Sequence, residues 1–250
     1  MKNKTIIIGL TVSLLLSTTA GRAAYTPTLE DDSIYEITNV SSAEEADFSL
    51  VEIDENGQAA VTYYKYNIKE GAVSHEPLDE DMKGQDITGN FFGQTGGNGA
   101  AITNRTDTVF NSWDIGNITG DFIGNYTLGS YSVQGGAIYN SSNGTAIIGD
   151  ITGNFLSNYV QYLSKYSKLT LGGAVYSNAN LSFTAKGKQR FFSGNYTNDQ
   201  TRGKNYNALF VQSVTDLASA PVIAFDTTGG GAWVVNDSIE GGYASSTDVT

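Results

Sequence analysis

The chain has 250 residues, with 29 glycines, 3 prolines and no cysteine, and 40% of its residues are hydrophobic. It carries 26 acidic against 14 basic residues, a net charge of −12, which disfavours binding to nucleic acid or to anionic membrane surfaces. Many glycines with few prolines favour tightly turning β structure over a proline-rich disordered chain. We therefore expect an all-β protein with no nucleic-acid partner.

The first residues predict an export signal. Lys2 and Lys4 precede an apolar run from Thr5 to Leu16, and Gly21–Ala23 offers small residues at a cleavage point. The run is shorter than the about 20 residues that a membrane-spanning helix needs. We predict a signal peptide over residues 1–23, and the absence of cysteine suits a chain that crosses membranes unfolded.

The next segment, residues 24–85, holds most of the acidity: 15 acids against 3 bases, whereas residues 86–250 hold 11 acids against 8 bases. Residues 24–47 are polar and acidic. Strand-forming residues on both sides of the turn at Asp54–Gly57 then predict a β-hairpin over 47–67. We expect this hairpin to cap the N-terminal end of the domain that follows.

The sole histidine, His75, lies beside the acidic stretch 76–81. A metal or catalytic role would need a partner histidine or cysteine, and the sequence has none. We therefore predict that His75 belongs to a solvated linker.

Two phrases alternate from residue 86 onward. The F-x-x-N phrase starts at four positions 31, 33 and 37 residues apart, and the first copy ends in Gln94 instead of Asn. The glycine phrase starts at three positions 36 and 37 residues apart, with a worn fourth copy from Tyr206. The starting residues are Phe91, Phe122, Phe155 and Phe192 for the first phrase, and Gly99, Gly135 and Gly172 for the second. Such alternation predicts stacked units with variable loops.

Short alternating runs between the phrases predict strands rather than helices, because apolar residues at 3.6 spacing are lacking. These runs are 145–148, 168–171, 181–183 and 222–225. Strands of this length suit a parallel β-helix over residues 86–250, in which each coil pairs with the coils above and below at about 4.8 Å. With one coil per half-repeat, we expect roughly seven to nine coils.

The repeated residues then have structural roles. The phenylalanines are expected to stack inside the solenoid, and the asparagines three residues later to form a ladder of amide hydrogen bonds at a corner. The glycine pairs are expected to supply positive φ at a sharp bend, each followed by an alanine in a crowded interior. The residues concerned are Asn125, Asn158, Asn195, Gly135–Gly136, Gly172–Gly173, Ala137 and Ala174.

The phrases GGAIYN and GGAVYS, paired with FIGN, FLSN and FSGN, resemble the GGA[ILV] and F-x-x-N tetrapeptides of polymorphic outer-membrane proteins. The resemblance covers residues 86–200 well and 201–245 more loosely. It implies a right-handed parallel β-helix, the passenger domain of an autotransporter displayed outside a Gram-negative cell. Such autotransporters end in a membrane β-barrel, whereas this sequence stops at Thr250 after a polar run. We therefore expect a fragment of a longer autotransporter or a secreted remnant.

Candidate sites are few. Lys186, Lys188, Arg190, Arg202 and Lys204 are five bases in about twenty positions. They predict either a groove for an acidic polysaccharide or, as we favour, a turn and a loop on one coil. The stretch 96–102 approaches a calcium-binding nonapeptide, but Ala101 stands where the ligand Asp is required. We predict no catalytic residue, no metal site and no cofactor.

The leading functional hypothesis is a non-enzymatic, exported module for adhesion or surface interaction. Its expected partner is a glycan or protein on a host or neighbouring cell, and also the outer membrane if a barrel follows in the full gene. Its expected location is the cell surface, the outer membrane or the extracellular space of a Gram-negative bacterium. One alternative is a β-helix polysaccharide lyase or hydrolase, with acids facing Lys186–Arg190. Another is a structural spacer with no specific ligand.

Overall fold

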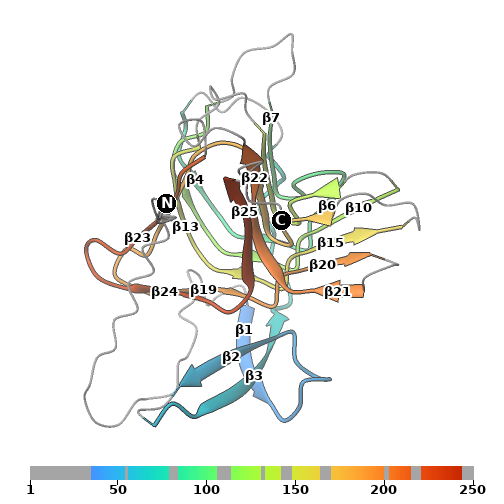
Figure 1. Cartoon of the computed structure of the whole chain (residues 1–250), viewed down its shortest axis with the longest axis vertical. Coiled ribbons are helices and arrows are strands. Elements are labelled where there is room, and N and C mark those ends of the chain that lie inside the picture. The colour runs from blue at the N-terminus through green and yellow to red at the C-terminus, as the bar shows by residue number, and fades with distance from the viewer. Residues whose placement is uncertain are drawn as a thin grey trace, which may run out of the picture.

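The computed structural model describes residues 35–53, 56–78, 84–105, 114–130, 133–141, 148–163, 170–199, 203–214 and 221–243. Their strands form a parallel β-solenoid of about four turns, accompanied by a three-stranded antiparallel sheet from the N-terminal part (Figure 1). This confirms the predicted all-β parallel solenoid. The predicted signal peptide lies outside the described residues.

Four parallel sheets run along the solenoid, and we name each after its first strand. The β4 sheet contains β4 (Ile87–Thr88), β8 (Ile118–Thr119), β13 (Asp150–Thr152), β18 (Leu181–Thr184) and β23 (Ile223–Asp226). The β5 sheet contains β5 (Phe91–Phe92), β9 (Phe122–Ile123), β14 (Phe155–Leu156), β19 (Gln189–Ser193) and β24 (Ala232–Val235).

The other two sheets complete each turn. The β6 sheet contains β6 (Thr95–Gly96), β10 (Tyr126–Gly129), β15 (Tyr159–Tyr162), β20 (Tyr196–Asp199) and the antiparallel edge strand β21 (Gly203–Asn205). The β7 sheet contains β7 (Ile102–Arg105), β12 (Ile138–Ser141), β17 (Val175–Ser177), β22 (Asn207–Val214) and β25 (Ser238–Tyr243). A further pair joins β11 (Val133–Gln134) and β16 (Thr170–Leu171).

The expectation of seven to nine coils is wrong, because both phrases belong to one turn. Phe155 pairs with Phe122 and with Phe192, so each F-x-x-N phrase lies in the β5 sheet beside its own copies. Ile138 likewise pairs with Ile102 and Val175, which places the glycine phrases in the β7 sheet. A full cycle of both phrases therefore makes one turn, and the chain completes about four.

The runs predicted as strands are found where they are described. β18 and β23 confirm the runs at 181–183 and 222–225, the second shifted by one residue. The run 168–171 is described from residue 170, where β16 begins, and 145–147 lie outside the described residues.

Phenylalanines stack along the interior as predicted. The ring centroids of Phe91, Phe122, Phe155 and Phe192 lie 5.1, 4.6 and 4.4 Å apart in succession, with planes within 5° of parallel. Phe183 meets the rings of Phe155 and Phe192 edge-on at 5.7 and 5.3 Å. All five side chains are buried, so this stack forms the centre of the hydrophobic core.

The asparagine ladder is also confirmed. The Nδ2 of Asn125 donates to the Oδ1 of Asn158, and the Nδ2 of Asn158 donates to the Oδ1 of Asn195, both at 2.9 Å. Each of the three amides also donates to a phenylalanine carbonyl of the preceding turn at 2.9 Å. The ladder ends on a carboxylate, because the Nδ2 of Asn195 donates to the Oδ2 of Asp237 at 2.8 Å.

A second buried ladder precedes the β5 sheet, and the repeat analysis did not identify it. The backbone N–H of Asp121 donates to the Oδ1 of Asn90, and the backbone N–H of Asn154 donates to the Oδ1 of Asp121, both at 2.7 Å. The Oδ2 of Asp121 accepts a short hydrogen bond from the hydroxyl of Tyr35 in the N-terminal sheet. Burial raises the pKa of Asp121 to about 6, while the hydrogen bonds from Tyr35 and Asn154 oppose that rise.

The positive φ that we predicted for both glycines of each pair is found only at the first. Gly135 and Gly172 each have φ of 66°, as predicted for the bend. Gly136 and Gly173 are needed for close approach instead: a Cβ on Gly136 would lie 2.0 Å from the carbonyl oxygen of Gly173. The interior positions that follow are fully buried, as expected, at Ala137 and Ala174.

The N-terminal sheet contains β1 (Tyr35–Val40), β2 (Phe48–Ile53) and β3 (Ala59–Ile68) in the order β1-β3-β2. The pairing of β2 with β3 confirms the predicted hairpin. Strand β1 was not predicted, because half of its residues are polar and only Tyr35 and Ile37 pack against the solenoid.

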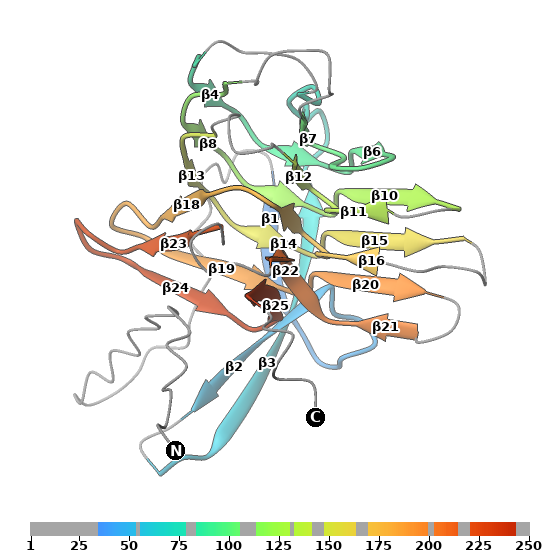
Figure 2. The same cartoon turned by 45° about the horizontal axis from the view of Figure 1, so that its top comes forward.

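This sheet does not cap the end of the solenoid, so that prediction is wrong. It packs sideways on the outer face of the β5 sheet, where a separate apolar cluster forms, and its hairpin projects away (Figure 2). The hydroxyls of Ser157 and Ser193 donate to the backbone carbonyls of Asp47 and Ser49 at 2.8 and 2.7 Å. The buried members of the cluster are Tyr35, Phe48, Leu50, Tyr64, Ile123, Leu156 and Phe191.

The segment around His75 covers the N-terminal end instead. The backbone N–H of His75 donates to the carbonyl of Asn90 at 2.8 Å, and its ring lies 4.8 Å from that of Phe91. Leu78 donates to the carbonyl of Ala101 at 2.8 Å. The solvated-linker prediction is therefore wrong: His75 is half-buried, and its ring packs against the end of the aromatic stack at an interplanar angle of 43°.

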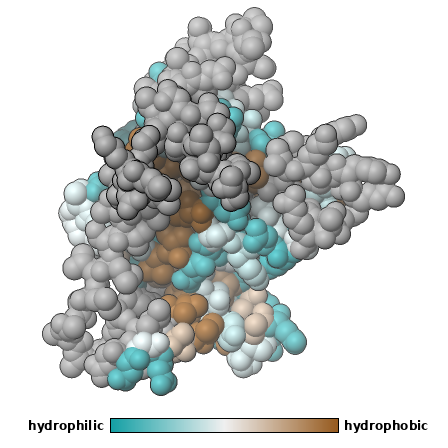
Figure 3. Space-filling view, viewed as in Figure 1, coloured by the Kyte–Doolittle hydropathy of each residue, from teal (hydrophilic) through white to brown (hydrophobic). Residues whose placement is uncertain are grey.

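At the opposite end, on β23, β24 and β25, the core residues are only partly buried, and Figure 3 shows hydrophobic surface in the middle of this face. These residues are Ile223, Phe225, Trp233, Val235 and Ile239.

Candidate binding surface

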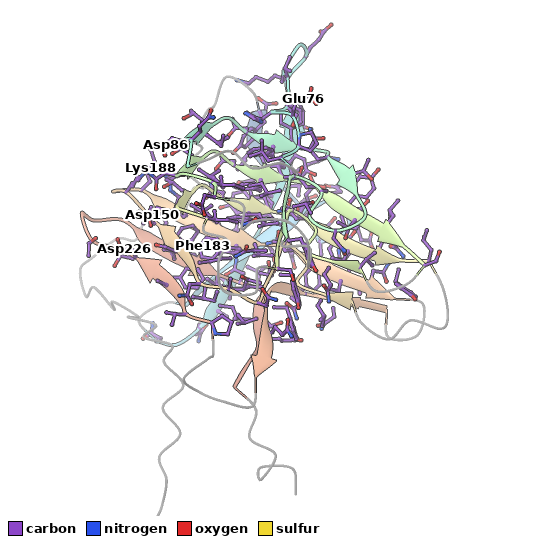
Figure 4. The ribbon with its side chains drawn as sticks, turned by 90° about the horizontal axis from the view of Figure 1, so that it is seen from above. Glu76, Asp86, Asp150, Phe183, Lys188 and Asp226 are labelled. Carbon is purple, nitrogen blue, oxygen red and sulfur yellow. The ribbon has the colours of Figure 1, made fainter. Side chains whose placement is uncertain are left out.

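Three carboxylates lie on the side of the solenoid formed by the β4 sheet. Figure 4 shows Asp86, Asp150 and Asp226 on this side, together with Lys188. The Oδ1 of Asp86 accepts the backbone N–H of Asn117 at 2.8 Å. Asp226 accepts both the N–H and the hydroxyl of Thr228, which lowers the pKa of its carboxyl. Within the described ranges, no three His, Cys, Asp or Glu side chains gather as metal ligands.

The basic cluster separates in the structure. Lys186 and Lys188 lie at the turn between β18 and β19, whereas Lys204 lies in β21 of another sheet. Arg190 is 1% exposed, its Nε donates to the carbonyl of Ala185 at 3.1 Å, and burial lowers its pKa to about 10. Arg202 lies outside the described residues. These bases therefore do not line one groove.

Ala101, which stands where a calcium-binding nonapeptide requires Asp, has a structural role. Ala101 is fully buried in the hydrophobic core. Its carbonyl accepts the hydrogen bond from Leu78 that closes the N-terminal end of the solenoid.

A row of three tyrosines crosses the outer face of the β6 sheet. Tyr126, Tyr159 and Tyr196 are the first residues of β10, β15 and β20 and pair in register. Their ring centroids lie 4.9 and 5.0 Å apart, with interplanar angles of 4° and 3°. Each ring is half-exposed, while the following residue of each strand points into the solenoid and is buried. We call Tyr126, Tyr159 and Tyr196 the tyrosine row.

We did not predict this row from the sequence, although its signal is present there. Each ladder asparagine is followed directly by tyrosine, at Asn125–Tyr126, Asn158–Tyr159 and Asn195–Tyr196. Neighbouring residues of a strand point to opposite faces. An inward asparagine ladder therefore predicts an outward ladder one residue later.

The hydroxyls of the tyrosine row remain available. Tyr162 and Tyr176 donate their hydroxyls within the chain at 2.6 and 2.7 Å, whereas in the described part of the chain no hydrogen bond engages those of the row. Burial and the neighbouring tyrosines raise the pKa of Tyr159, and raise that of Tyr196 to about 12. These hydroxyls therefore stay protonated and can both donate and accept.

Polar residues continue the surface beside the row. Gln161 and Asn198 lie two residues further along their strands, and the Nδ2 of Asn198 donates to the Oε1 of Gln161 at 3.0 Å. The Nζ of Lys204 lies 3.9 Å from the ring centroid of Tyr196 and 4.7 Å from that of Tyr206, so it covers the last ring.

An open groove adjoins the row where the N-terminal sheet meets the last coil. It has a volume of about 280 Å³, and Tyr63 and Asp47 line one side while Tyr206 and Asp237 line the other. Burial of Tyr66 of β3, together with Asp47, Tyr159 and Tyr196, raises its pKa to about 12.

Comparison of the chain with protein-family models, with curated proteins and with solved structures gave no match. In the part of the chain described, no helix combines the length and the apolar character needed to cross a membrane. The fold and these surface rows define the protein as a parallel β-solenoid with stacked Phe and Asn ladders inside and a tyrosine row outside.

Proposed function

We propose that the protein is an exported, non-enzymatic binding module that attaches to a glycan or protein on a host or neighbouring cell. The observation that carries the proposal is the tyrosine row: three half-exposed rings in register, with hydroxyls that the described residues leave unused. Stacked coils provide an extended rigid face of the kind that repeat proteins use for binding.

We further propose that the chain is a passenger-type module related to polymorphic outer-membrane proteins, with a right-handed coil. In support, the phrases that carry the resemblance are the residues that build the phenylalanine and asparagine ladders. Such a module would be found at the cell surface, on the outer membrane or in the extracellular space of a Gram-negative bacterium. It would be attached to the outer membrane where a barrel follows in the gene.

Binding arrays of glycans and of cell-surface proteins test the proposal. The wild-type chain should bind at least one member, and the triple variant Tyr126→Ser, Tyr159→Ser, Tyr196→Ser should lose that binding. Tyr139→Ser is the matched control, because Tyr139 is half-exposed and stacks at 5.3 Å on Tyr176 in the neighbouring β7 sheet. If neither array gives binding, or if the triple variant binds like wild type, the proposal is wrong and a spacer role is favoured.

A further inference from the structure

We propose that the tyrosine row binds a neutral, linear polysaccharide laid parallel to the solenoid axis, through hydroxyl hydrogen bonds rather than ring faces. This inference rests on the proposed function and specifies its ligand. It follows from three properties of the row: which parts of the rings are accessible, how they are spaced, and what charge surrounds them.

The ring faces within the row and at its Tyr196 end are not available to a ligand. Tyr126, Tyr159 and Tyr196 stack with interplanar angles of only 4° and 3°, so that each inner face contacts a neighbouring ring. The Nζ of Lys204 lies 3.9 Å from the centroid of Tyr196 and covers that end of the row. What the row presents outward is ring edges and hydroxyls, which recognise hydrogen-bonding groups and not apolar sugar faces.

The spacing of the rings matches the repeat of a polymer. The rings repeat at 4.9 and 5.0 Å because parallel strands fix the distance between successive turns. That repeat is close to the length of one sugar residue in an extended polysaccharide chain. A linear glycan along the axis would thus place one sugar residue beside each tyrosine, and the amides of Gln161 and Asn198 extend the polar contact to a second row.

The charge of the surface favours a neutral chain. Residues 86–250, which carry the row, hold 11 acidic against 8 basic residues, and the base at the row, Lys204, is held against the rings of Tyr196 and Tyr206. The adjoining groove adds the carboxyl groups of Asp47 and Asp237. One base beside two carboxyl groups gives a polymer of uronates or sulfated sugars no net attraction.

Affinity electrophoresis tests the inference with four probes: hydroxyethyl cellulose and glucomannan as neutral linear chains, dextran as a neutral flexible chain, and polygalacturonate as an acidic linear chain. The wild-type protein should be retarded by at least one of the first two and less by the others. The triple variant Tyr126→Phe, Tyr159→Phe, Tyr196→Phe keeps the stacked rings and removes the hydroxyls. Its affinity should fall about tenfold or more, as expected for three lost hydrogen bonds.

Tyr139→Phe serves as the control and should bind like wild type, and circular dichroism should show that both variants are folded. Equal binding by the triple Phe variant would overturn the inference, as would a preference for polygalacturonate or dextran. Absence of binding to both neutral linear probes would also overturn it. If an array ligand is nonetheless lost in the Tyr→Ser variant, only the polysaccharide assignment fails and the proposed function stands.

Discussion

Replacement of the central ladder residue, Asn158→Ala, tests whether the amide ladder stabilises the fold. The Asn158 side chain is fully buried and makes four hydrogen bonds. Its Oδ1 accepts the backbone N–H and the Nδ2 of Asn125 at 3.0 and 2.9 Å. Its Nδ2 donates at 2.9 Å to the carbonyl of Phe122 and to the Oδ1 of Asn195.

The magnitude follows from these four bonds. A hydrogen bond contributes about 1 kcal/mol net, and a buried group left without a partner costs about 1–3 kcal/mol. The Nδ2 of Asn125 keeps its hydrogen bond to the carbonyl of Phe91 at 2.9 Å, so this group is not left without a partner in the variant. We expect Asn158→Ala to reduce the free energy of unfolding by about 4 kcal/mol, a large part of the roughly 5–15 kcal/mol of a typical domain.

Urea unfolding followed by circular dichroism measures this change. The control is Asn117→Ala, because Asn117 is exposed and its side chain accepts a single backbone N–H, from Asp150, at 3.0 Å. The control should lose about 1 kcal/mol or less. A loss below about 1 kcal/mol in Asn158→Ala would refute the argument, since the ladder would then accompany the fold without stabilising it.

Three further predictions follow from the interior contacts. Burial raises the pKa of Asp121 and Asp237 from 3.8 to about 6, so between pH 6 and pH 3.8 the folded chain binds more protons than the unfolded chain. The melting temperature should therefore rise as pH falls from 7 to 5, and Asp121→Asn should reduce that rise. Asp150→Asn removes an exposed carboxyl and should not reduce it. Gly136→Ala should destabilise strongly, because the new Cβ would lie 2.0 Å from the oxygen of Gly173, whereas Gly97→Ala meets no atom within 4 Å and should be near neutral in thermal melts. Tyr35→Phe removes the hydroxyl that donates a hydrogen bond to Asp121. Limited proteolysis should therefore release the N-terminal sheet faster from this variant than from the Tyr63→Phe variant, and equal rates would contradict this.

The interior ladders could be predicted from the sequence because equivalent residues of successive turns contact one another. A residue repeated once per turn must stack on itself, so the phenylalanine and asparagine spacings determined both ladders before any pairing was known. The same spacing did not determine the number of coils, since two phrases can lie on two sides of one turn. Only the register of Phe155 with Phe122, and of Ile138 with Ile102, resolves that ambiguity.

The N-terminal sheet was harder to place, because nothing in it repeats. Its position depends on outward apolar residues next to the stacked phenylalanines, Ile123 and Leu156, which would otherwise be exposed. An apolar residue on the outer face of a solenoid strand needs a cover, and this signal was present in the F-I-G-N and F-L-S-N phrases. The misassignment of His75 has a similar origin: its partner is the ring of Phe91, which local composition does not indicate.

The adjacency of asparagine and tyrosine in each turn separates stability from recognition. Asn158 points inward and is hydrogen-bonded to both neighbouring turns, while Tyr159 points outward from the same corner. The ladder therefore fixes the backbone that spaces the tyrosines, and the row is already ordered before a ligand arrives. Because a preorganised surface loses little conformational entropy on binding, a row of only three hydroxyl-bearing rings would suffice for the polymer binding that we propose, with one sugar residue beside each turn.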